Sequence, residues 1–221
     1  SYTDALSTSE SVTSSATSAV ANIEDEASGT LSVTGVASEG SSLGISFSPS
    51  DPDGSISTVY QWQVSSDNSS WSDIDGATGS SFSLASDQSD VGKYFRVTAV
   101  TTDSFGGTTN FTSSATSAVS NVNDSPTGSV VISGTVTEDQ VLTASNNLAD
   151  LDGLGSISYQ WVRAGSDIDG ATGSTYTLTQ ADVGSVMTVK ASYTDALSTS
   201  ESVTSSATSA VSNVNDSPTG S

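Results

Sequence analysis

Two short acidic strings occupy matching places in the two halves of the chain. They read Asp51-Pro-Asp53-Gly and Asp150-Leu-Asp152-Gly. Each string sets two carboxylates close together, and carboxylate, amide and carbonyl oxygens are the ligands that Ca²⁺ takes in flexible shells of about six to eight oxygens. Mg²⁺ demands a stricter octahedron and suits such a set less well. We therefore expect these strings to supply calcium ligands.

Two further strings, Asp73-Ile-Asp75-Gly and Asp167-Ile-Asp169-Gly, look similar but favour a different interpretation. Asp side chains often accept hydrogen bonds from the backbone two residues on, which closes a tight turn. No linker acids are expected beside these two strings. We therefore interpret them as turns.

The composition excludes several classes of function. The net charge is -21, from 25 acidic and 4 basic residues, which excludes binding to nucleic-acid phosphates. A charge of this sign also keeps a surface protein soluble without binding anything. The chain has no His and no Cys, so it has no Ser-His-Asp or Cys-His nucleophile, no common zinc site and no disulfide. No run of about 18 apolar residues is present, so we expect no membrane insertion.

Long repeats divide the chain. Residues 1–20 recur identically at 192–211, and Asn-Val-Asn-Asp-Ser-Pro-Thr-Gly-Ser stands at both 121–129 and 213–221. A period of about 92 to 99 residues is too long for a solenoid and fits a self-contained β-sandwich. The expected organisation is a strand fragment of a preceding repeat at 1–21, repeat 1 at 22–120, repeat 2 at 121–212, and a linker opening the next repeat at 213–221.

Alternating side chains predict an all-β fold. In residues 186–193, Met187, Val189, Ala191 and Tyr193 share one face, and turn residues recur every 8 to 12 positions. We expect tandem immunoglobulin-like Greek-key β-sandwiches arranged end to end as a rod. The strands expected in repeat 2 are 129–132, 141–145, 157–161, 175–178, 186–193 and 202–211.

The tryptophans have two kinds of setting. Trp62 and Trp161 stand in matching Tyr-Gln-Trp strings, and we expect both in the sandwich cores. Trp71 lies in a five-residue insertion of repeat 1. It either packs over its own hairpin or is exposed, in which case it would serve a carbohydrate- or protein-binding surface.

The sandwich topology brings the remaining acids together. Loops after the second and sixth strands lie where the chain enters a sandwich, and loops after the first and fifth lie where it leaves, so acids of neighbouring repeats meet at the linker. Two carboxylates about 4 Å apart repel by about 4 kcal/mol at an effective dielectric constant of about 20. With 4 basic residues in the chain, Ca²⁺ is the expected counter-charge. The candidate ligands are Glu24, Asp25, Asp51, Asp53 and Asp103 at the first junction; Glu39, Asp90, Asn121, Asn123, Asp124, Asp150, Asp152 and Asp195 at the second; and Glu138, Asp182, Asn215 and Asp216 at the third.

The linker resembles a known type. Asn-Val-Asn-Asp-Ser-Pro is similar to the Asp-x-Asn-Asp-x-x-Pro linker of cadherin-like repeats, which bind calcium between domains. Tyr-Gln-Trp, Asp-Ile-Asp-Gly-Ala-Thr-Gly-Ser and Thr-Tyr-Thr-Leu-Thr-Gln-Ala-Asp-Val-Gly look like phrases of the tandem immunoglobulin-like repeats of giant bacterial RTX-type adhesins. The resemblance implies type I secretion, a place on the bacterial cell surface and a spacer role in calcium. The first junction, Asn22-Ile-Glu24-Asp25-Glu26, departs from the pattern because it has no Pro.

These observations favour a structural spacer, or extender, over the other functional classes. We expect a calcium-stiffened spacer that projects a distal binding region, with a binding module that uses Trp71 as the alternative. Carboxylate pairs can hydrolyse glycosides, but these acids gather at domain ends, so we expect no enzyme and no small-molecule substrate. The expected partners are neighbouring repeats of the same chain. We expect a monomer whose residues 1–21 form a hairpin or an edge strand that can exchange with another molecule.

Overall fold

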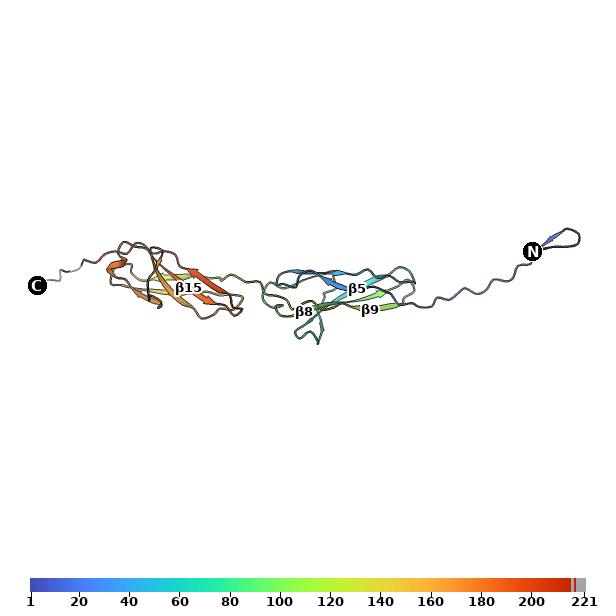
Figure 1. The fold of residues 1–221 in the computed structure, drawn as a ribbon, viewed down its shortest axis with the longest axis horizontal. Helices are drawn as coiled ribbons and strands as arrows, with labels where there is room; N and C mark the ends of the chain where they lie inside the picture. Colours follow the sequence, from blue (N-terminus) through green and yellow to red (C-terminus); the bar gives the residue numbers. More distant parts are fainter. Residues whose placement is uncertain (216, 218–221) are drawn as a thin grey trace.

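The computed structural model describes residues 1–215 and 217, and the chain forms two β-sandwiches that follow one another along the long axis (Figure 1). We call them sandwich 1, which contains strands β3 to β9, and sandwich 2, which contains β10 to β16. Strands within each sheet pair antiparallel. The expected all-β fold is confirmed: the described residues contain no helix beyond a single 3-10 turn, η1 (Gln180–Asp182).

Each sandwich stacks a three-stranded sheet on a four-stranded one. The smaller sheet of sandwich 1 has the order β3 (Ser32–Thr34), β4 (Ser42–Ser46), β7 (Ser81–Ser83). Its larger sheet has the order β6 (Ser72–Asp73), β5 (Ser57–Ser65), β8 (Tyr94–Thr102), β9 (Thr108–Thr112). The smaller sheet of sandwich 2 has the order β10 (Val130–Ser133), β11 (Val141–Asn146), β14 (Thr175–Thr177). Its larger sheet has the order β13 (Ser166–Asp167), β12 (Ser158–Arg163), β15 (Met187–Thr194), β16 (Ser200–Thr204). Consecutive strands β4 and β5 lie in different sheets, as do β7 and β8, which is Greek-key connectivity.

The last strand of sandwich 2 differs from the expectation. The alternating pattern predicted one strand over residues 202–211, but β16 ends at Thr204. The regular pairing stops there, although the N–H groups of Ser205 and Thr208 still donate to the carbonyls of Val189 and Met187 on β15, both at 2.9 Å. Val211 and Ser212 then form isolated parallel bridges with Val183 and Thr137. The final segment thus follows the edge of β15 irregularly and ends in bridges to two loops of the sandwich.

Burial follows the alternation along the central strands. On β15, the side chains of Met187, Val189, Ala191 and Tyr193 are buried while those between them are half-exposed, as expected. Strand β8 of sandwich 1 alternates in the same way from Phe95 onward. Each sandwich therefore has its own hydrophobic core.

The two core tryptophans are anchored identically. Trp62 and Trp161 are fully buried, as expected. The indole N–H of Trp62 donates to the carbonyl of Gly79 at 3.0 Å, and that of Trp161 donates to the carbonyl of Gly173 at 2.9 Å. Both glycines close the repeated Gly-Ala-Thr-Gly string, so this string satisfies the polar atom that a buried indole carries.

The two Asp-Ile-Asp-Gly strings form tight turns, as expected. The N–H of Ala77 donates to the carbonyl of Ile74 at 3.1 Å, and Gly76 between them has a φ of 70°. This left-handed conformation is cheap only for glycine. The second string closes in the same way, with 3.1 Å between Ala171 N and Ile168 O.

Trp71 is engaged within sandwich 1. Its ring is half-buried, and the guanidinium carbon of Arg96 lies 4.3 Å from the ring centroid. This is a cation–π contact. It joins the insertion beside β6 to β8, across the intervening strand β5.

Residues 1–26 run out from sandwich 1 as an extended arm (Figure 1). Its tip is a hairpin of β1 (Tyr2–Thr3) and β2 (Ser9–Glu10), which is one of the two expected forms. Asp4 Oδ1 accepts the turn N–H groups of Leu6 and Thr8 at 2.9 and 2.8 Å. Tyr2 is 63% exposed whereas the equivalent Tyr193 is 5% exposed, so the arm has no sheet behind it. Strand exchange with another molecule stays a prediction.

Candidate metal centre

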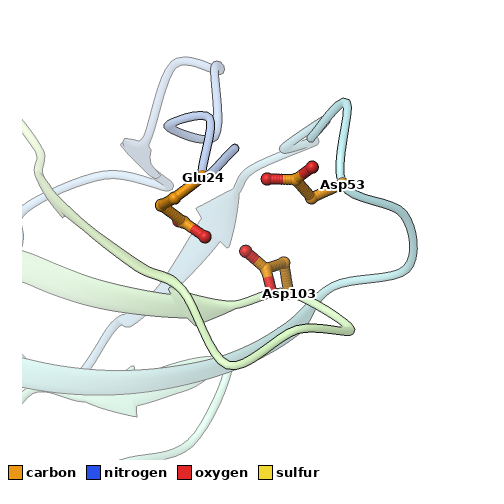
Figure 2. Close-up of side chains that lie close together, drawn as sticks. All are labelled: Glu24, Asp53 and Asp103. Carbon is orange, nitrogen blue, oxygen red and sulfur yellow. The ribbon is translucent and has the colours of Figure 1, made fainter. Parts of the chain in front are cut away.

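Three carboxylates converge where the chain enters sandwich 1 (Figure 2). Glu24 comes from the arm, Asp53 from the loop between β4 and β5, and Asp103 from the loop between β8 and β9. One carboxylate oxygen of each lies within 4.8 Å of the others. The structure thus brings together three of the five candidates for the first junction.

The two carboxylate oxygens of Asp103 differ in their contacts. Its Oδ1 accepts the backbone N–H groups of Phe105 at 2.6 Å and Gly107 at 3.1 Å, which close the turn between β8 and β9. Its Oδ2 is buried and has no hydrogen-bond partner among the described residues. A buried carboxylate oxygen without a partner is costly, so this atom indicates a missing positive group.

Asp53 ties the arm to the sandwich. The residue is 8% exposed, and its Oδ2 accepts the N–H of Asp25 at 2.8 Å. Its own N–H donates to Asp51 Oδ1 at 2.8 Å, which fixes the loop. Asp25 and Asp51 therefore position Asp53 through backbone contacts in this structure.

The charges of the three acids influence one another's protonation. Burial, followed by the negative charges of Asp103 and Asp53, raises the pKa of Glu24. Burial would also raise the pKa of Asp103, but the N–H groups of Phe105 and Gly107 outweigh it and lower that pKa. Of the two acids, Glu24 is thus the one whose ionised form is disfavoured by the neighbouring negative charges.

Gly107 makes room for Glu24. A Cβ added at Gly107 would fall 1.7 Å from Glu24 Oε1, which no side chain could share. The absence of a side chain at this position therefore permits the close approach of Glu24 to Asp103.

The second junction has a different centre, the carboxamide of Gln88. Gln88 lies in the loop between β7 and β8, and its Nε2 is 2.6 Å from Asn121 Oδ1 and 2.5 Å from Asp152 Oδ1. Glu39 Oε2 and Asp124 Oδ2 lie 3.1 and 3.5 Å from the same nitrogen. Sandwich 1, the linker and sandwich 2 all contribute oxygens to this group.

Backbone contacts fix the linker at the second junction. Glu39 Oε2 accepts the N–H of Val122 at 3.1 Å, and Asp152 Oδ2 accepts the N–H of Asp124 at 2.7 Å. Glu39 and Asp152 are 8% and 3% exposed. The contact of Asp124 with Asp152 repeats that of Asp25 with Asp53, so the two junctions share a plan.

Asp195 repeats the arrangement of Asp103. Its Oδ1 accepts the N–H groups of Leu197 and Thr199, both at 2.8 Å, and its buried Oδ2 has no partner among the described residues. Thr199 stands where sandwich 1 has Gly107, and Asn123 stands where the arm has Glu24. Asn123 Nδ2 donates 2.8 Å to Glu201 Oε1 instead of joining the acids.

Asp150 supports its neighbour. Its Oδ1 accepts the N–H of Asp152 at 2.9 Å, and its Oδ2 accepts the hydroxyl of Tyr193 at 2.5 Å. Burial, followed by the hydrogen bond to Asp150, raises the pKa of Tyr193. Asp150 therefore holds the loop that presents Asp152.

The end of sandwich 2 repeats part of the second junction. Glu138 is 3% exposed and its Oε2 accepts the N–H of Val214 at 3.2 Å, while Gln180 Nε2 lies 3.3 Å from Asn213 Oδ1. Asn215 also interacts with a neighbouring group. Asp216 lies outside the described residues.

The structure corrects the expectation that Asp182 and Asp90 face the following repeat as ligands. Asp182 is fully buried, and its Oδ1 accepts Arg163 Nε at 2.6 Å while its Oδ2 accepts the N–H of Thr179 at 2.7 Å. Asp90 Oδ2 accepts the N–H of Ala85 at 2.9 Å. Both carboxylates fasten their own loop, as acids in turns often do.

The ion pairs of the protein do not neutralise the acids at the first or the second junction. Within residues 1–215 and 217 they are Lys93 with Asp90 at 3.7 Å and Arg163 with Asp182 at 2.6 Å. Arg96 covers Trp71, and Lys190 lies in the middle of β15. The converging oxygens therefore have no internal cation.

Sequence reasoning missed Gln88 and Gly107. Gln88 is neutral and lies outside the linker, whereas the expected ligands were acids and linker asparagines. A signal does exist, because a Gln stands two residues before Asp-Val-Gly in both repeats, as Gln88 and Gln180.

No protein-family model and no curated protein matches the chain. Solved structures that it resembles include one described as a Ca²⁺-stabilized adhesin that helps an Antarctic bacterium reach out and bind ice, at a TM-score of 0.34 and 14% identity. That match covers 86% of this chain and 50% of the other. A second concerns host cell surface retention of a 1.5-MDa bacterial ice-binding adhesin, at a TM-score of 0.33 and 14% identity, and covers 86% of this chain and 66% of the other.

The chain spans only half to two thirds of the length of these adhesin structures. Both TM-scores are low, so these matches assign no role to this chain. Among the described residues, no helix has the length and apolar character needed to cross a bilayer.

Proposed function

We propose that this chain is a spacer of a bacterial cell-surface adhesin, in which Ca²⁺ bound at the junctions fixes the angle between successive sandwiches. The observation that carries the proposal is the buried, unpartnered Oδ2 of Asp103 beside Glu24 and Asp53. Asp195 presents an equivalent unpartnered oxygen at the second junction.

The ligand chemistry favours calcium. The converging groups are carboxylate and amide oxygens, without the nitrogen or sulfur ligands that zinc prefers. The arrangement uses loops and a linker, which suit the flexible coordination of Ca²⁺ better than the strict octahedron of Mg²⁺. Glu24, Asp53 and Asp103 would hold the ion at the first junction.

The mechanical role follows from what the ligands are attached to. Glu24 belongs to the arm, whereas Asp53 and Asp103 belong to two loops of sandwich 1. An ion between them would bind the entering chain to both loops and oppose their mutual repulsion. Extracellular modules bind calcium at about 10⁻⁴ to 10⁻³ M, so the spacer would stiffen outside the cell.

Calcium binding should be measurable as added stability and extension. A ligand that binds only the folded state raises its stability by mass action. We expect excess Ca²⁺, relative to EDTA, to raise the melting temperature and to lengthen the maximum dimension seen by small-angle scattering. Mg²⁺ at equal concentration should have the smaller effect.

The variant Gly107→Ala sharpens this test because it removes no carboxylate. The added methyl would displace Glu24 from Asp103, so we expect calcium affinity at the first junction to fall about tenfold. The matched control is Gly79→Ala, whose Cβ would lie 3.4 Å from its nearest neighbour. Isothermal titration that detected no calcium binding by the wild type, or equal binding by Gly107→Ala, would contradict the proposal.

A further inference from the structure

The carboxamide of Gln88 is shared by more acceptors than it can satisfy. Its Nε2 lies within 2.5 to 3.5 Å of oxygens from Glu39, Asn121, Asp124 and Asp152. A carboxamide nitrogen has two protons, so Gln88 can donate a full hydrogen bond to only two of the four oxygens. The site needs more positive charge than an amide provides.

The position of Gln88 is held by its backbone at some cost. Its N–H donates to Glu39 Oε1 at 3.0 Å, and its φ is 67°, in the left-handed region that disfavours L-residues other than Gly, Asn and Asp. Backbone strain of this kind persists where surrounding contacts impose it. These contacts place the side chain of Gln88, which belongs to sandwich 1, directly against Asp152 of sandwich 2.

Each neighbour of Gln88 lies about as far from its terminal nitrogen as two ligands of one ion lie from each other, although Glu39, Asp124 and Asp152 do not themselves converge as the acids of the first junction do. Oxygens that share a Ca²⁺ at about 2.3 to 2.6 Å lie roughly 3 Å from one another. The terminal nitrogen of Gln88 has this separation from its four neighbours. The carboxamide oxygen would take the place of the nitrogen after a half-turn, because the two ends are nearly identical in size and shape.

An independent feature points to a cation at this end of sandwich 2. Asp195 is 5% exposed and its Oδ2 has no hydrogen-bond partner among the described residues. Its loop contacts that of Asp152, since the N–H of Ala196 donates to the Asp152 carbonyl at 3.2 Å.

We propose that Gln88 is a switchable contact between the sandwiches. Without an ion, its carboxamide N–H groups donate to Asp152 and Asn121 and hold the junction closed. With Ca²⁺ bound, the carboxamide turns and its Oε1 becomes a ligand supplied by sandwich 1. This inference rests on the proposed function, because it assigns a ligand and an ion-free state to the same junction.

Calcium titration tests the ligand role. In an Asp53→Asn background, which disables the first junction, calorimetry reports the junction of Gln88. We expect Gln88→Gly, which suits the left-handed backbone, to weaken calcium binding about tenfold. The control Asn68→Gly makes the same kind of change at an exposed residue of sandwich 1 that also has a left-handed backbone, with a φ of 56°, and should leave the affinity unchanged. Unchanged or tighter binding by Gln88→Gly overturns the ligand role.

Distance measurements test the ion-free contact. The chain has no Cys, so Ser81→Cys and Ser133→Cys on exposed strand positions accept spin labels without background. In EDTA we expect a narrower distance distribution for the otherwise wild-type chain than for Gln88→Gly, and Ca²⁺ should narrow that of the wild type further. Equal widths in EDTA overturn the contact.

The variant Gln88→Glu separates the two states. A carboxylate beside Asp152 should broaden the distribution in EDTA by repulsion, yet bind calcium at least as tightly as the wild type. Weaker calcium binding by Gln88→Glu than by Gln88→Gly overturns the proposal. A wild type that binds no calcium overturns the proposed function as well, whereas calcium binding that is indifferent to Gln88 overturns only this inference.

Discussion

At the scale of single residues, the same amino acid has two opposite roles in this chain. Asp103 and Asp195 each leave one buried oxygen without a partner, whereas both oxygens of Asp182 are hydrogen-bonded. The first arrangement leaves a buried oxygen that an external cation could bind. The second completes an internal network with Arg163 and Tyr176 that fastens η1 to β12.

The network of Asp182 predicts acid sensitivity of sandwich 2. Burial would raise the pKa of Asp182, but hydrogen bonds from Thr179 and Arg163 outweigh it and lower that pKa. Because the folded-state pKa is depressed, the stabilisation is present above the unfolded-state value of about 3.9 and is lost as pH falls through the folded-state pKa. We expect the melting temperature of sandwich 2 to fall from about pH 4 downward.

The variant Asp182→Asn should flatten this pH dependence in calorimetry, and Asp182→Ala should cost about 3 kcal/mol at neutral pH because it leaves Arg163 unpaired. The equivalent Asp90→Ala should cost less, since Lys93 lies 3.7 Å away and is partly exposed. Equal losses for the two variants would contradict this account.

The sequence indicated some of the site residues and not others. Repeated aspartates beside predicted turns made Asp53, Asp103 and Asp195 candidates, because carboxylates in loops carry a visible charge signal, and the structure places all three near the ends of the sandwiches where the chain enters. Gln88 carries none. Asp182 was misassigned because its local string does not reveal Arg163, which reaches it from β12 across the fold.

At the scale of elements, alternation predicted the strands well because burial on one face repeats every second residue. The extent of the last strand was wrong, since regular pairing in β16 ends at Thr204 and the following residues reach β15 only through separate hydrogen bonds before the parallel bridges of Val211 and Ser212. Those bridges depend on residues far away in the sequence, so a local pattern could not reveal them.

The two separate cores predict two separate unfolding transitions. Met187 on β15 and Phe95 on β8 are equivalent, and each is buried in its own cluster. Met187→Ala should cost sandwich 2 about 2 to 5 kcal/mol through the cavity it leaves. Calorimetry should show one transition lowered and the other unmoved.

The variant Phe95→Ala serves as the mirror control and should lower the transition that Met187→Ala leaves in place. A common shift of both transitions by either variant would show that the sandwiches unfold as one unit.

At the scale of the whole molecule, the net charge of -21 acts on every contact between the sandwiches. Raising the salt concentration from about 0.01 to 1 M shortens the Debye length from about 30 to 3 Å and screens this repulsion. In EDTA we therefore expect NaCl to raise the melting temperature. In saturating Ca²⁺ the salt effect should be smaller, because the ion already offsets the charge at the junctions. A scan that found the same salt dependence with and without calcium would contradict the electrostatic account.

The hairpin at the tip of the arm bears on how such a chain acquires its shape. Residues 1–10 form the same aspartate-closed turn as residues 192–201, although no sandwich stands behind them. A turn that needs no tertiary support can form within microseconds, ahead of the slower pairing of distant strands. In each repeat this turn joins the last two strands of the larger sheet, β8 to β9 and β15 to β16. A newly synthesised repeat can therefore start to assemble from its C-terminal third, with the earlier strands docking onto a nucleus already made.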